Sequence, residues 1–330
     1  SVKRAISTSS CTSALETIFN SINLNKNDEI IIPCQTFIAS VSTILRFGAK
    51  PVITEIDNQF NLDFDDMKKK ISHKTKAVVI VHFAGRISKD ILLIKKFLKE
   101  KKILLIEDAA HALGANFNGK KAGSIGDISA FSFYSTKIIT TGEGGMITTD
   151  NLSLSNKCLQ FRSRGAKLNS KYEIYNSLGT NHRITEFQGI LGLVQLKRID
   201  QFIAHRNSIA NTYNHILCQF SEKNILNIPT IDKNSTSSFW RYIIILNKKI
   251  NRKKIIFNLR KLSIDVINSY EPLIHKQPLF QTYLKQKKPK LNFSENYCKK
   301  HIMLPIHFNI KIKDAIYIAK ALIKYIKLEI

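Results

Sequence analysis

Residues 103–150 contain side chains of the kinds that bind and use a charged cofactor. Asp108 follows a short apolar run that reads as a buried parallel strand, so we expect it at the carboxyl edge of a sheet, where open α/β folds place ligands. Ser132 and Lys137 come at and after the end of a second short strand. The glycines of residues 140–145 leave the next loop unobstructed. This combination suits a phosphorylated aromatic cofactor.

Lys137 is the candidate for covalent chemistry. A lysine amine can form a Schiff base with an aldehyde, and pyridoxal phosphate is the common partner of such a lysine. A carboxylate at the pyridine nitrogen, a role open to Asp108, keeps that ring protonated and electron-withdrawing. Spacing alone leaves an alternative open, because lysine is abundant in this chain and Lys137 could be an ordinary surface residue.

Apolar runs alternate with amphipathic stretches through the first part of the chain. This alternation predicts βαβ units and a mostly parallel sheet. We expect strands at 28–33, 51–56, 75–81 and 103–106. We expect helices at 12–23, 36–47, 63–71 and 88–101.

The second part of the chain predicts a different organisation. Heptad-like apolar spacing over about 184–220 indicates one long helix linking two domains. A strand at 239–246 and a closing helix at 310–326 follow it. We therefore expect a large α/β domain over 1–200 and a smaller α+β domain over 201–330.

The net charge of +26, from 51 basic and 25 acidic residues, allows two interpretations. One is a surface for nucleic acid or anionic lipid. The other is a lysine-rich chain whose charges lie on solvated helices such as 89–102 and 311–327. The second is favoured because no basic motif is interleaved with aromatic residues, and we expect no nucleic-acid partner. A positive surface could still attract anionic nucleotide sugars.

The remaining bulk properties point to a cytoplasmic protein. No apolar run approaches the length of a membrane span, and no secretory signal appears. The 5 cysteines are scattered without ligand spacing, which fits reduced thiols and no bound metal.

The chain resembles the sugar aminotransferases of the DegT/DnrJ/EryC1/StrS family, which are fold-type I pyridoxal-phosphate enzymes acting on nucleotide-linked keto sugars. The central motifs that carry the resemblance are IEDAAHALGA, FSFYSTK and TTGEGGMITTD. The resemblance implies a large domain with a mostly parallel sheet sandwiched by helices, plus a smaller C-terminal α+β domain. It also implies a homodimer with shared active sites.

The resemblance also implies roles for residues around the cofactor. Lys137 would form the Schiff base, Asp108 would pair with the pyridinium nitrogen, and His111 would pack by the ring or its phenolic oxygen. The phosphate would be bound by Ser132, Thr12, Ser13 and, from the other subunit, Asn181. An ordinary helix N-cap is the alternative for the segment containing Thr12 and Ser13.

Five further residues match family positions near the substrate, namely Phe37, His82, Arg183, Tyr270 and His275. Each has a structural alternative. Phe37 could belong to the core, His82 could be a packed histidine at a strand end, and Arg183 could be a surface residue that caps a helix. Tyr270 and His275 could simply be packed side chains.

The resemblance predicts transfer of an amino group from L-glutamate to a nucleotide-linked keto sugar. The TTGEGG and AAHA sequences look like those of relatives acting at C4, which favours a 4-keto-6-deoxyhexose. The alternatives are a 3-keto sugar or a keto-cyclitol, or a regulator of this fold without turnover. An intact set of Lys137, Asp108 and Ser132 argues against the regulator.

Overall fold

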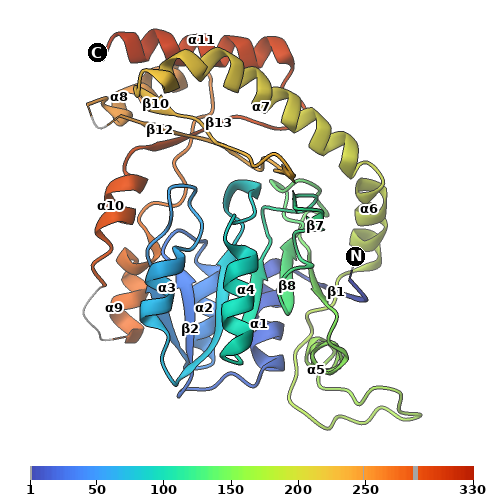
Figure 1. Ribbon diagram of the computed structural model, residues 1–330. Coiled ribbons are helices and arrows are strands. Elements are labelled where there is room, and N and C mark those ends of the chain that lie inside the picture. Colours follow the sequence, from blue (N-terminus) through green and yellow to red (C-terminus); the bar gives the residue numbers. More distant parts are fainter. Residues whose placement is uncertain (1, 248, 285–288) are drawn as a thin grey trace.

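The computed structural model describes residues 2–247, 249–284 and 289–330. Its centre is a seven-stranded sheet with the order β1-β9-β8-β5-β4-β2-β3 (Figure 1). These strands are β1 (Arg4–Thr8), β2 (Glu29–Pro33), β3 (Lys50–Thr54), β4 (Thr75–Val81), β5 (Leu104–Asp108), β8 (Ile128–Ser132) and β9 (Gly145–Thr149).

Pairing in this sheet is mostly parallel. Strand β2 runs parallel to β3 and β4, β4 to β5, and β5 to β8, whereas β9 is antiparallel to both β8 and β1. The predicted α/β class is confirmed. Strands β1 and β9 were not predicted, because neither carries a long apolar run.

Helices cover both faces of this sheet. Ile30 and Ile32 of β2 share a core with α1 and α2, whereas Ile31 shares a different core with α3 and α4. Successive strand residues point to opposite faces, so an unbroken isoleucine run is what a sheet buried on both sides requires. The helices of this layer are α1 (Cys11–Ser21), α2 (Ala39–Arg46), α3 (Phe64–Lys70), α4 (Ile91–Glu100) and α5 (Leu152–Arg162).

A second layer lies above the sheet in Figure 1. It is a three-stranded antiparallel sheet of β10 (Leu226–Asn227), β12 (Tyr242–Leu246) and β13 (His301–Leu304). Helices α7 (Ile199–Glu222), α8 (Arg252–Lys261) and α11 (Ile312–Lys327) share a core with it. The domain boundary near residue 200 stays a prediction.

The predicted linking helix at about 184–220 is wrong as a single element. The chain instead forms α6 (Glu186–Leu196) and α7, with a break at Lys197 and Arg198. Arg198 has a backbone conformation outside the helical region. The spacing hides this break because apolar residues continue on both sides of it. Helix α7 buries one face, whereas α6 buries no residue of its own.

Close backbone contacts join the two layers. The short 3₁₀ turn η1 (Phe83–Gly85) follows β4, and the Gly85 carbonyl accepts hydrogen bonds from the Ser238 N–H and the Ser237 hydroxyl, both at 3.0 Å. Gly85 has φ +92°, and a Cβ there would lie 2.3 Å from Ser238 Oγ. Only glycine fits this contact without displacement.

The C-terminal part also returns to the large sheet. The Gln35 side chain donates to the Ser269 carbonyl at 2.9 Å, and Ser294 N–H donates to Glu55 at 2.8 Å. The remaining elements are β6 (Asn116–Phe117), β7 (Lys120–Lys121), β11 (Ser235–Thr236), η2 (Ile274–Lys276), α9 (Pro278–Leu284) and α10 (Asn292–Cys298). Within the described residues, no helix has both the length and the apolar character that crossing a bilayer requires.

Candidate active site

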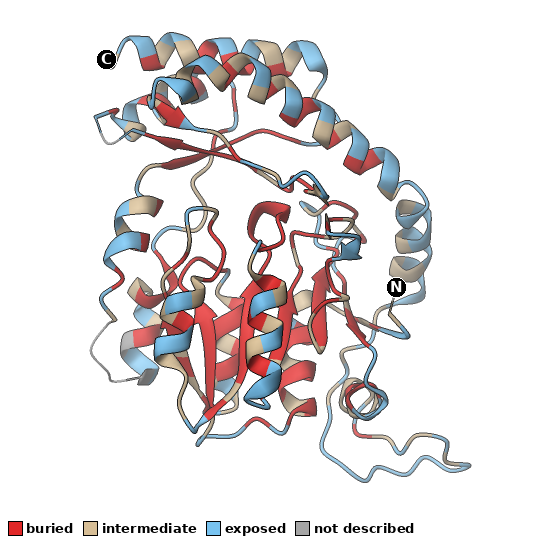
Figure 2. Ribbon diagram, viewed as in Figure 1, coloured by how far each residue is buried: buried red, intermediate tan, exposed pale blue. Residues whose placement is uncertain are grey.

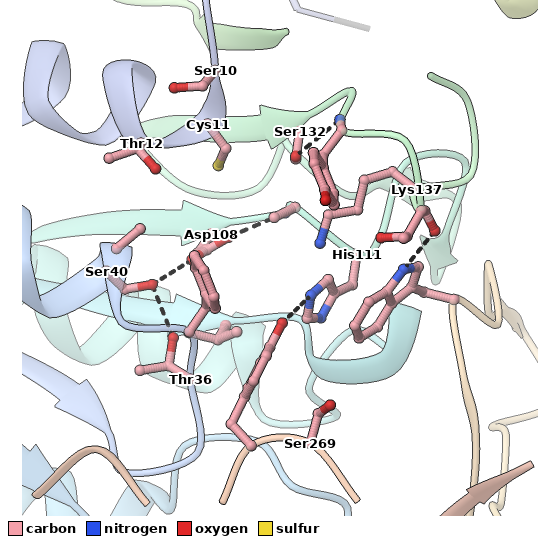
Figure 3. A pocket seen from close by; sticks show the side chains of 18 of the residues that line it. Ser10, Cys11, Thr12, Thr36, Ser40, Asp108, His111, Ser132, Lys137 and Ser269 are labelled. Carbon is pink, nitrogen blue, oxygen red and sulfur yellow. Dashed lines mark hydrogen bonds between the residues drawn. The ribbon is translucent and has the colours of Figure 1, made fainter. Parts of the chain in front are cut away.

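A cavity of about 520 Å³ lies at the carboxyl ends of β4, β5 and β8, between the two layers. We call it the active-site cavity (Figure 3). Ends of parallel strands are where open α/β sheets place their ligands. Seven of the twelve predicted site residues line it, namely Thr12, Phe37, Asp108, His111, Ser132, Lys137 and Tyr270.

Lys137 is half-buried, and its Nζ lies 4.4 Å from the centre of the Trp240 ring. Burial lowers the pKa of Lys137 to about 8, and the positive charge of Arg241 acts in the same direction, whereas Cys11 and Asp108 oppose it. A lysine with this pKa is neutral far more often at pH 7 than an ordinary one. The amine is therefore suited to nucleophilic attack and to proton transfer.

Asp108 is 5% exposed and is held by neutral donors. Its Oδ2 accepts a hydrogen bond from Ser40 Oγ at 2.7 Å, and Ser40 Oγ lies 2.9 Å from Thr36 Oγ1. Its Oδ1 accepts from the Ala110 N–H at 3.1 Å. None of the ion pairs found among the described residues uses Asp108. The carboxylate can thus pair with a cation in the cavity.

His111 forms one wall of the cavity as part of an aromatic group. Its ring stacks on Trp240 with centroids 3.7 Å apart and an interplanar angle of 10°, and its Nε2 lies 3.3 Å from Tyr270 Oη. The Trp240 indole N–H donates to the Thr136 carbonyl at 2.9 Å. Burial, then the charges of Lys137 and Arg241, lower the pKa of His111 well below its usual value. The imidazole is therefore neutral.

The amino end of α1 forms another wall of the cavity. Ser10 caps this helix by accepting the Ser13 N–H at 3.0 Å, and Cys11 and Thr12 lie in its first turn. First-turn N–H groups have no partner within the helix and point outward, which suits a phosphate. Ser132 lines the same cavity.

Ser13 does not line the cavity. Its hydroxyl lies 2.8 Å from both Ser9 Oγ and Ser10 Oγ, so the side chain supports the helix cap. In this segment, the residues next to Ser13, and not its own side chain, would have to contact the phosphate.

Two predicted histidines lie outside the cavity as packed residues. The fully buried His82 has its Nε2 2.7 Å from Glu107 Oε2, and Glu107 also accepts the N–H groups of Gly123 and Ile125 at 2.8 Å. His275 Nε2 lies 3.1 Å from Glu295 Oε1. Both histidines are therefore packed side chains, which was the alternative to a position near the substrate. The position of His82 at the end of a strand could not show whether its side chain points into the cavity or into the core, because both orientations are possible there.

Asn181 and Arg183 are exposed and line no part of the active-site cavity of this chain. Arg183 Nε donates to Asn181 Oδ1 at 3.0 Å. The prediction for Asn181 requires a second subunit, so its role stays a prediction.

The lining residues that were not singled out from the sequence include Cys11, Ser40, Trp240 and Arg241. Ser40 stands four positions after Thr36 in a stretch that the sequence predicts as helical, a spacing that could have indicated a shared face, although α2 begins only at Ala39. Trp240 and Arg241 precede β12, although the sequence placed both inside a strand. The pKa of the Cys11 thiol is raised by burial and by Asp108, so the thiol is protonated.

Residues 1–323 match the model of the DegT/DnrJ/EryC1/StrS aminotransferase family. The chain is 34% identical to the GDP-perosamine synthase of Caulobacter vibrioides over 93% of this chain and 81% of the relative. It is 32% identical to the UDP-4-amino-4,6-dideoxy-N-acetyl-beta-L-altrosamine transaminase of Helicobacter pylori, over 98% and 86%. It is also similar in structure to Helicobacter pylori PseC, an aminotransferase involved in the biosynthesis of pseudoaminic acid, with a TM-score of 0.91, 31% identity and coverage of 99% and 88%.

A mixed sheet with a lysine and a carboxylate at its strand ends, together with these matches, defines an aminotransferase fold. The chain belongs to the DegT/DnrJ/EryC1/StrS aminotransferase family, and it is an enzyme of the transferase class. The family and the enzyme class predicted from the sequence are confirmed.

Proposed function

We propose that this enzyme uses pyridoxal phosphate to move an amino group from L-glutamate to a nucleotide-linked keto sugar. The observation that carries this proposal is the meeting of Lys137, Asp108 and the amino end of α1 in one cavity. The names of relatives support the substrate class, since they include a GDP-perosamine synthase and a UDP-sugar transaminase.

The residues present fit the cofactor. Ser132 and the first turn of α1 would hold the phosphate, Asp108 would pair with the pyridine nitrogen, and Lys137 would bind the aldehyde carbon. Phe37 lines the cavity with half of its surface exposed and offers an apolar face to a flat ring. When bound, pyridoxal phosphate supplies an aldehyde that takes up the amino group and a ring that withdraws electrons from the reacting carbon.

The side chains of this enzyme then have distinct tasks. The Lys137 amine, whose pKa burial lowers to about 8, would carry the proton that has to move during the transfer of the amino group. The Ser40 hydrogen bond keeps Asp108 oriented, and the carboxylate would hold the ring nitrogen of the cofactor in its protonated form. Stacking on Trp240 fixes the neutral His111 beside the site of reaction.

For the acceptor we propose a 4-keto-6-deoxyhexose linked to a nucleotide. The AAHA and TTGEGG sequences lie at Asp108 and at Glu143, and both residues line the cavity. The relative that is a UDP-4-amino-4,6-dideoxy sugar transaminase supports amination at C4.

Turnover of defined substrates tests this proposal. We expect 2-oxoglutarate to form from L-glutamate when a nucleotide-linked 4-keto-6-deoxyhexose is present, and the sugar to gain an amino group at C4 by mass spectrometry and NMR. The matched comparison is the corresponding 3-keto sugar nucleotide. Faster turnover of the 3-keto compound would contradict the assignment of C4, and turnover of neither would contradict the substrate class.

We also propose a homodimer in which α6 forms part of the interface. Phe187 is 86% exposed, Leu193 64% and Val194 54%, and the whole helix is exposed or half-buried in Figure 2. Several exposed apolar side chains on one helix are typical of a protein interface. The segment between α5 and α6 contains the exposed Asn181, which would reach the active-site cavity of the second subunit.

A further inference from the structure

A second cavity, of about 510 Å³, adjoins the active-site cavity and shares Thr136, Lys137 and Arg241 with it. Its wall comes from the loop after β8, the junction of α6 and α7, and residues 306–309 that follow β13. We call it the basic cavity. Its position places any bound group next to the Lys137 amine.

Positive charge dominates the basic cavity. Arg198, Arg206, Arg241 and Lys137 line it, and the described lining contains no aspartate or glutamate. None of the three arginines belongs to an ion pair found among the described residues. Asp265 acts on Arg241 from outside the lining. A concave group of cations focuses a positive potential and attracts anions.

The arginines are held in place, yet part of their hydrogen-bonding capacity is free. Arg206 is 5% exposed and its Nη1 donates to the carbonyls of Phe239 at 2.9 Å and Ile306 at 2.6 Å. The Nε atoms of Arg206 and Arg241 are buried and have no partner in the described part of the chain. Buried donors normally have acceptors, so these two N–H groups are unsatisfied within the described part of the chain.

Aromatic rings position the other two guanidinium groups. Arg198 lies over the Phe202 ring at 4.9 Å and over Phe308 at 5.5 Å, and Arg241 lies over Trp240 at 4.7 Å. Stacking on an aromatic face leaves the planar N–H fork of an arginine free to bind oxygen atoms. Both side chains are therefore arranged to receive an anion with several oxygens.

We propose that the basic cavity binds the diphosphate of the nucleotide-linked substrate and that Arg198 and Arg241 are its direct ligands. This inference rests on the proposed function. A diphosphate has more charge and more acceptor oxygens than the carboxylate of an amino donor, for which one guanidinium fork is sufficient. A diphosphate bound here would hold the attached sugar next to Lys137, where the amino group is transferred.

Calorimetric titration of the pyridoxal-phosphate-loaded enzyme with GDP, UDP and inorganic pyrophosphate tests the proposal. We expect Arg198→Gln and Arg241→Gln each to weaken binding of all three probes by about tenfold or more, because each loses a charge-assisted hydrogen bond. Arg198 is exposed at the cavity rim, so its replacement leaves the core intact. The control is Arg4→Gln, since Arg4 is exposed and lines neither cavity. It should leave the affinities unchanged.

The glutamate half-reaction distinguishes the possible sources of the anion. We expect its KM to change by less than about twofold in Arg198→Gln, because a diphosphate contact outside the active-site cavity does not bind the donor. A raised KM for glutamate with unchanged binding of the three probes would assign the cavity to the donor carboxylate and overturn the proposal. Unchanged binding in both variants, or no binding of any probe to the wild-type enzyme, would also overturn it. Loss of the half-reaction in the wild-type enzyme would instead contradict the proposed function.

Discussion

Lys137 is surrounded by groups that shift its pKa in opposite directions. Burial favours the neutral amine and lowers the pKa to about 8, while Asp108 and Cys11 favour the charged form. At pH 7 about a tenth of such amines are neutral, compared with far fewer for a free lysine. The site therefore keeps a reactive amine without removing the carboxylate that the cofactor ring requires.

This balance predicts a pH dependence. We expect the cofactor-free protein to capture pyridoxal phosphate at a rate that rises with pH through about 8, since only the neutral amine attacks an aldehyde. Asp108→Asn should move this midpoint to lower pH, because it removes a negative charge that favours the protonated amine. Stopped-flow absorbance from about pH 6 to about pH 10 measures both profiles.

Asp65→Asn is the control for that series, since Asp65 is 77% exposed in its side chain and lines neither cavity. Its midpoint should equal that of the wild type. A midpoint above that of the wild type in Asp108→Asn would contradict the assigned role of the carboxylate.

At the scale of elements, apolar patterning predicts what packs within one chain. The alternating runs predicted β2 to β5 with their helices, because a strand buried on both faces must be almost continuously apolar. The same pattern could not predict the break between α6 and α7, because apolar residues lie on both sides of it although only α7 buries residues within this chain. The exposed apolar residues of α6 would be explained by the second subunit that we propose.

The exposure of α6 leads to a prediction about assembly. We expect the double variant Phe187→Asp with Leu193→Asp to weaken the dimer by about a hundredfold or more, because two apolar contacts are replaced by buried charges. Size-exclusion chromatography with light scattering measures the mass, and the same samples give the activity, which should fall with the dimer. Leu328→Asp is the control, as Leu328 is 68% exposed on the closing turn after α11. A double variant that stays dimeric would contradict this interface.

At the scale of the whole molecule, the cavity depends on segments far apart in sequence. Asp108, Ser132 and Lys137 could be predicted because they follow strands of one sheet, whose ends meet at one edge. Trp240 and Arg241 could not, since they reach the cavity only through the docking of the second layer at Gly85. His82 and His275 matched family positions, yet partners at Glu107 and Glu295 hold them elsewhere.

The visible absorption spectrum of the purified protein tests the central claim most directly. We expect protein reconstituted with pyridoxal phosphate to show the band of the lysine-bound cofactor, and excess L-glutamate to convert that band to the one of the amine form. Lys137→Ala should lack the first band. A reconstituted wild-type protein without this band, or a band that glutamate leaves unchanged, would contradict the assignment of Lys137 and of the donor half-reaction.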